Sequence, residues 1–79
     1  MWYFQVNQED LRRPIYQTLQ KMAVLTEVEI FNEPYHNWCI FQVERSQYVA
    51  FIEILDSDGV AYQATTDRPL REELLAGMR

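Results

Sequence analysis

The residues with the greatest capacity for chemistry lie in one short segment, residues 33–39. Glu33, His36 and Cys39 offer an oxygen, a nitrogen and a sulfur ligand at even spacing. Zinc sites usually have four ligands in which Cys and His dominate, and this chain holds only one of each. The segment also spans a predicted loop and the start of a predicted strand, so the spacing does not bring the three together. We predict no metal site.

Cys39 with His36 as its base is the enzymatic interpretation of the same residues. A reactive thiolate needs a lowered pKa, which a helix N-terminus or a nearby cation supplies. Cys39 instead lies between Trp38 and Ile40 in an apolar strand within an acidic segment. We therefore expect no catalytic residues and no cofactor, and a small Cys/His enzyme is only a remote alternative.

The carboxylates are numerous, but they form neither a hydrolase pair nor a calcium loop. A glycosidase needs two acids across a cleft, and a sheet of this size leaves little room for one. Asp56, Asp58 and Gly59 are superficially similar to a calcium-binding loop. The later spaced acids and the closing Glu of that motif are missing, and a hairpin turn explains the segment.

Length and composition indicate one small globular domain covering residues 1–79. The chain is 48% hydrophobic and 14% aromatic, which is typical of a folded protein. Its single cysteine excludes an internal disulfide framework. No apolar run approaches the roughly 20 residues of a membrane span, and the N-terminus lacks the pattern of a signal peptide. We expect a cytoplasmic protein with no membrane contact.

The net charge of −5 is unevenly distributed. Seven acidic residues and one arginine lie between Glu27 and Asp58, whereas the rest of the chain is almost balanced. This places the negative charge on the predicted sheet. Direct binding to nucleic acid normally needs a basic surface, so we expect none.

Hydrophobic periodicity predicts the elements of the first half of the chain. Trp2–Val6 alternates as a strand, and a helix with an apolar stripe begins close to Pro14 and ends near Ala23 or Val24. Residues 26–31 alternate as a half-buried strand with an acidic outer side. A loop follows over 32–37, and a further strand over 38–44.

The second half is predicted to hold a hairpin and a helix. Residues 48–55 are apolar on both faces and rich in β-favouring types, which predicts a buried strand. Asp58-Gly59 is a typical hairpin turn, and the next strand covers residues 60–65. A final helix opens at residues 67–69, with Thr66 or Asp67 as its N-cap, and Gly77 marks its end.

These elements predict an α+β fold. We expect an antiparallel, four- to five-stranded meander sheet with one helix packed on a face and a short C-terminal helix. The expected core is Phe4, Leu11, Ile15, Leu19, Met22, Val28, Ile30, Ile40, Phe41, Val43, Phe51, Ile52, Ile54, Leu55, Tyr62, Leu70 and Leu74.

The function expected from these patterns is protein binding without catalysis. An inhibitor or adaptor would cover a basic surface of a larger protein, for example one that binds nucleic acid, as proteins of phages and mobile elements often do. The alternative is an assembly or structural subunit with an apolar interface, including a homodimer. The candidate partner-binding residues are the acidic side chains Glu27, Glu29, Glu44 and Glu53 and the aromatic side chains Tyr3, Tyr35 and Trp38.

Overall fold

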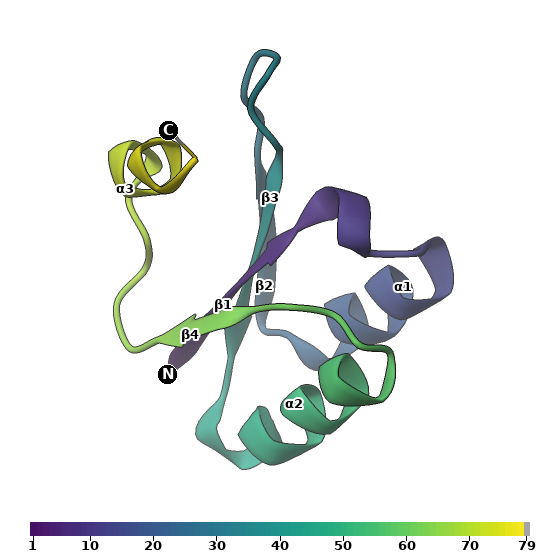
Figure 1. Ribbon diagram of the computed structural model, residues 1–79. Helices are drawn as coiled ribbons and strands as arrows, with labels where there is room; N and C mark the ends of the chain where they lie inside the picture. Colours follow the sequence, from purple (N-terminus) through teal and green to yellow (C-terminus); the bar gives the residue numbers. More distant parts are fainter. Residues whose placement is uncertain (79) are drawn as a thin grey trace.

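The computed structural model describes residues 1–78 as an α+β protein with four strands and three α-helices (Figure 1). This confirms the predicted fold class. In chain order the elements are β1 (Trp2–Asn7), α1 (Arg13–Met22), β2 (Leu25–Glu29), β3 (Trp38–Val43), α2 (Tyr48–Ser57), β4 (Gln63–Thr65) and α3 (Arg71–Gly77). Short 3₁₀ turns at Gln8–Asp10 and Arg45–Gln47 precede α1 and α2.

The four strands form one antiparallel sheet in the order β2-β3-β1-β4. β1 and β3 are central, and the two edges are β2 and the three-residue β4. Up to β4 the element order is βαββαβ, the split arrangement of ferredoxin-like folds. The predicted meander is therefore wrong, because β4 pairs with β1 on the far side of the sheet from β2.

The predicted strand over residues 48–55 is wrong, because this segment forms α2. Tyr48, Phe51, Ile52 and Leu55 recur at the i, i+3, i+4, i+7 spacing of a helical face, and all four pack into the core. The opposite side of α2 carries exposed residues, among them Glu53. Helical packing therefore overrides the strand propensity of the β-branched and aromatic types.

The predicted Asp-Gly hairpin is also wrong, since Gly59 ends α2. Gly59 has a φ of +67°, in the left-handed region that glycine adopts without a steric penalty. The N–H of Val60 donates to the carbonyl of Leu55 at 2.9 Å, and the N–H of Gly59 donates to that of Asp56 at 3.1 Å. This is the Schellman arrangement, and the side chains of Leu55 and Val60 are both buried in the core beside it.

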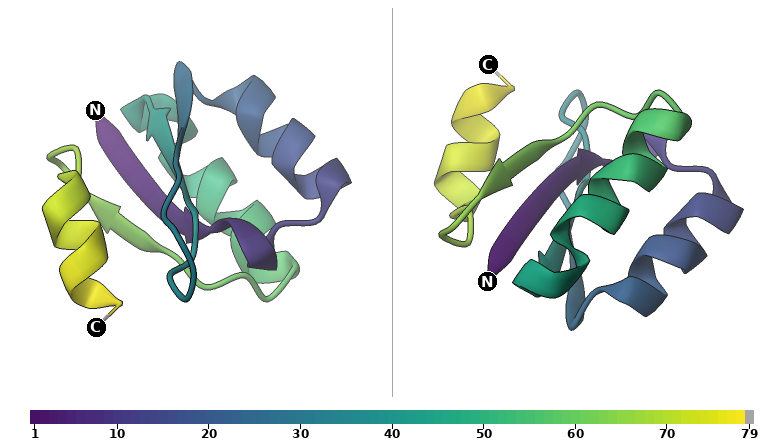
Figure 2. Two further views of the ribbon diagram at one scale, coloured as in Figure 1. Left: turned by 90° about the horizontal axis from the view of Figure 1, so that it is seen from above. Right: turned by 90° about the horizontal axis from the view of Figure 1, so that it is seen from below.

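The two faces of the sheet are covered unequally. α1 and α2 lie beside each other over one face, and α3 lies on the opposite side of the sheet (Figures 1 and 2). The helical side holds the main core, which includes Phe4, Phe41 and Phe51. The side facing α3 holds a smaller cluster built on Phe31, Ile40 and Leu74, with further apolar side chains packed around it.

Several predicted details differ from the structure. Val28, Ile30 and Leu70 were expected in the core and are exposed. The last helix begins at Arg71 with Leu70 as its N-cap, rather than at residues 67–69, because the chain is still extended at Leu70. β1, α1, β2 and β3 fall within two residues of their predicted bounds.

Candidate protein-interaction surface

The most distinctive surface feature is an apolar stretch along the free edge of the sheet. In the described part of the chain, β2 has β3 on one side and no strand on the other. Seven large hydrophobic side chains among residues 1–78 are exposed, and four of them, Val24, Leu25, Val28 and Ile30, fall within residues 24–30. We call residues 24–30 the β2 edge. Lysine and proline, which commonly protect such edges, do not occur in it.

The side chains of β2 alternate between the two faces of the sheet. Thr26 and Val28 lie opposite core residues of β3, so they face the helical side. Leu25, Glu27 and Glu29 face the α3 side. An incoming strand beside β2 would therefore meet an apolar row on one face and a mixed apolar and acidic row on the other.

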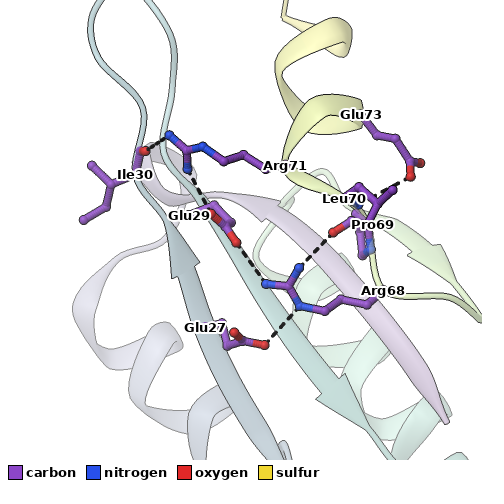
Figure 3. Close-up of polar contacts among 8 residues, drawn as sticks. All are labelled: Glu27, Glu29, Ile30, Arg68, Pro69, Leu70, Arg71 and Glu73. Carbon is purple, nitrogen blue, oxygen red and sulfur yellow. Dashed lines mark hydrogen bonds and ion pairs between the residues drawn. The ribbon is translucent and has the colours of Figure 1, made fainter.

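Glu27 and Glu29 are held by two arginines from the far end of the chain (Figure 3). Nε of Arg68 donates to Glu27 at 3.1 Å and Nη2 of Arg68 donates to Glu29 at 3.0 Å. Nη1 of Arg71 donates to the second oxygen of Glu29 at 2.9 Å, and its Nη2 donates to the carbonyl of Ile30 at 2.7 Å. These contacts link β2 to the segment that leads into α3 and to the first residue of the helix.

The two glutamates differ in what remains available to a partner. Both carboxylate oxygens of Glu29 accept hydrogen bonds, and its side chain is 22% exposed. The bonds from Arg68 and then Arg71 hold the pKa of Glu29 below its usual range. Glu27 uses one oxygen, is 44% exposed, and its other oxygen has no bond within residues 1–78.

The four candidate glutamates do not form one surface. Glu27 and Glu29 lie together on the α3 side of β2. Glu44 is exposed just beyond the end of β3, and Glu53 is exposed on α2 beside the groove between α1 and α2. The structure therefore brings together only the β2 pair, and it balances that pair internally with arginines.

The three candidate aromatic residues belong to the packing of α3. Tyr3, Tyr35 and Trp38 are half-buried against the cluster of Phe31, Ile40 and Leu74. Nε1 of Trp38 donates to the sulfur of Met78 at 3.0 Å. Trp38 therefore packs beside the end of α3 instead of standing fully exposed as an interface anchor.

Cys39 and His36 do not form a catalytic pair. Cys39 is buried in the core on the helical side, and burial raises the pKa of its thiol to about 11. His36 is exposed in the β2–β3 loop, where its Nδ1 lies 3.4 Å from a carboxylate oxygen of Glu9. Within residues 1–78, no three His, Cys, Asp or Glu side chains gather closely enough to hold a metal ion.

A cleft of about 700 Å³ separates α3 from the β1–β4 part of the sheet. The amides of Gln5 and Gln63, which are cross-strand partners, line it together with Asn7 and Thr65. These groups can donate and accept hydrogen bonds, and the charged side chains Asp10, Asp67, Arg68 and Glu73 line the cleft as well. The lining contains no serine, cysteine, histidine or lysine that could act as an activated nucleophile or as its base. The cleft alone does not define a reaction.

Comparisons with models of protein families, with curated protein sequences and with solved structures found no significant match. None of the helices formed by residues 1–78 combines the length and apolarity required to cross a membrane.

Sequence reasoning missed the exposed edge and the two arginines. Alternation in residues 26–30 correctly indicates a strand, but alternation alone does not tell an edge strand from a covered one. Arg68 and Arg71 are separated from Glu27 and Glu29 by about forty residues. The only available signal was charge complementarity between a pair of glutamates two residues apart and a pair of arginines three residues apart.

Proposed function

We propose that this chain is a small, non-enzymatic protein-binding protein that acts as an inhibitor or adaptor by covering a surface of a larger protein. The observation that carries the proposal is the free β2 edge, where four large apolar side chains are exposed along one short stretch. Contiguous exposed apolar residues are characteristic of interaction sites.

The edge offers backbone as well as side-chain recognition. One row of N–H and C=O groups on an edge strand has no partner in its own sheet, so a strand of another protein can pair with it. Pairing would extend the four-stranded sheet and cover Leu25, Val28 and Ile30. The backbone bonds would supply affinity, and the alternating side chains would supply specificity.

Charge favours a partner with a basic surface. The net charge of −5 creates an attractive field for a cationic protein, which speeds association and disfavours acidic partners. Glu44 and Glu53 contribute to this field from exposed positions away from the β2 edge. These two glutamates would attract the basic partner during the encounter, whereas the apolar β2 edge would form the contact itself.

The test uses affinity capture from source lysate with two matched variants. Ile30→Asp places a charge on the β2 edge, and Val49→Asp places the same charge on α2. Both side chains are β-branched and aliphatic, and they are 66% and 65% exposed, so the control is matched in side-chain class and accessibility. We expect a partner retained by the wild type and by Val49→Asp to be lost from Ile30→Asp.

Circular dichroism of each variant shows whether it is folded. Equal retention by all three proteins would overturn the β2 edge as the contact. Loss of the partner from both variants would show that net charge, rather than the β2 edge, determines binding. Washing at high salt separates the two contributions, because salt screens the ionic attraction and leaves the apolar contact intact.

A further inference from the structure

We infer that the occupant of the β2 edge is an extended partner segment that places apolar side chains on the helical side of the sheet and a lysine or arginine beside Glu27. The inference rests on the proposed function and adds the chemistry of the partner. It follows from the two rows of side chains that β2 presents and from the difference between its two glutamates.

The helical side of the edge selects apolar residues. Thr26 and Val28 face this side, and Val28 is exposed although its cross-strand partner Cys39 is buried. A strand added beside β2 would place every second side chain next to this row, at the roughly 4.5–5.5 Å separation of cross-strand neighbours. An apolar side chain there removes exposed apolar surface from water, whereas a charged one would lose hydration without a partner.

The α3 side of the edge selects a cation at one position. Both oxygens of Glu29 already accept a hydrogen bond from Arg68 or Arg71, whereas Glu27 keeps a carboxylate oxygen that has no bond within residues 1–78. Arg68 already occupies the inner side of Glu27, so a partner's ammonium or guanidinium group would approach from the open edge (Figure 3). Opposite charges on neighbouring strands stabilise their pairing, and like charges oppose it.

The same charges disfavour a second copy of this chain as the occupant. Two β2 strands related by a twofold axis at Glu27 would place Glu27 opposite its own copy. Moving the axis to Val28 would place Glu27 opposite Glu29. Both of these registers set carboxylates against each other, so a partner strand with a basic residue beside Glu27 fits the edge better than self-pairing in either of them.

The experiment measures binding of two synthetic ten-residue peptides to the ¹⁵N-labelled full chain. One peptide alternates valine with lysine, and the other alternates valine with glutamate. We expect the lysine peptide to shift the backbone amide signals of residues 24–30 and to bind more tightly than the glutamate peptide. Glu27→Gln should reduce that preference by roughly two- to fivefold, the range of one cross-strand charge pair.

Glu53→Gln is the matched control, because it removes the same charge from α2, away from the β2 edge. It should leave the preference for lysine nearly unchanged, and the amide spectra of both variants show whether Arg68 and α3 keep their positions. An equal reduction by both variants would assign the preference to net charge and overturn the role of Glu27.

The remaining outcomes separate this inference from the proposed function. Equal shifts of residues 24–30 by both peptides would overturn the basic partner but leave the β2 edge as a docking strand. No shift of these residues by either peptide would overturn both. Concentration-dependent dimerisation in sedimentation that protects the amides of residues 24–30 without peptide would identify a second copy as the occupant.

Discussion

Individual residues of this protein take their chemical character from their surroundings rather than from their type. Cys39 is the only thiol of the chain, but it lies in the core between the sheet and the two helices that cover it. Burial without a neighbouring cation stabilises the neutral thiol over the thiolate. Glu27 and Glu29 differ for a similar reason, since the number of arginine contacts decides what each can still bind.

We predict that Cys39 is inert in the folded protein. Its pKa of about 11 leaves almost no thiolate at pH 8, and the surrounding core excludes reagents. In native buffer a disulfide reagent should therefore modify the thiol only at the rate of unfolding, and in denaturant one thiol should react at once. Absorbance of the released thiolate follows both reactions. Rapid modification in native buffer would contradict this placement of Cys39.

At the scale of single elements, the end of α2 shows how one glycine fits two different local structures. A hairpin turn and a helix C-terminus both need a residue with positive φ, so Asp58-Gly59 is compatible with either. The flanking residues decide between them, because Leu55 and Val60 are brought together in the core only when the segment before the glycine is helical.

We predict that Gly59→Ala destabilises the protein by about 1–2 kcal/mol, the cost of a left-handed conformation for a residue with a Cβ atom. Nothing lies within 4 Å of the added carbon, so the effect comes from the backbone and not from a clash. Gly77→Ala is the control: it is also unobstructed, lies in α3 and has no positive φ, so it should be neutral or slightly stabilising. Urea unfolding of the two variants makes the comparison, and equal effects would refute the assigned cap.

At the scale of the whole molecule, α3 is a short helix attached to the sheet by two kinds of contact. Apolar packing around Leu74 holds one side of it. Arg68, which precedes α3, and Arg71, its first residue, form ion pairs with β2. The arginine contacts also occupy both oxygens of Glu29 and one oxygen of Glu27 on the β2 edge. The same residues therefore link the position of α3 to the surface that we propose for partner binding.

We predict that Glu29→Gln lowers stability by about 1 kcal/mol at pH 7, because these pairs are partly solvent-exposed. The pKa of Glu29 is lowered in the folded state, so its stabilisation is complete above the carboxyl's unfolded pKa. This stabilisation is lost as the pH falls through the lowered pKa that Glu29 has in the folded state. Urea unfolding should therefore show the difference between variant and wild type at pH 7 and a much smaller one at pH 3.

Glu44→Gln serves as the control for this measurement, since Glu44 is exposed and forms no ion pair within residues 1–78. It should have little effect at either pH. A loss in Glu29→Gln that persists unchanged at pH 3 would show that the side chain acts through packing rather than through its charge.

The sequence by itself determined the α+β class and the positions of β1, α1, β2 and β3. β1, α1 and β2 each have one dominant hydrophobic period, and β3 is a short apolar run that follows a loop containing Pro34. Such local signals need no information from the rest of the chain. For α2 both periods were present, because residues 48–55 are apolar at strand and helix spacing alike. Only the packing of Phe51 and Leu55 against the sheet decides for the helix.

The tertiary structure alone decided which strand forms the edge and which charges meet. Strand order depends on pairing between distant segments, and β4 reaches β1 only because α2 crosses back over the sheet. Val28 and Ile30 were assigned to the core because alternation marks a strand, whereas their exposure depends on the absence of a neighbour beyond β2. Glu29 and Arg71 meet across about forty residues for the same reason: local sequence specifies elements, and contacts between elements are set by how they pack.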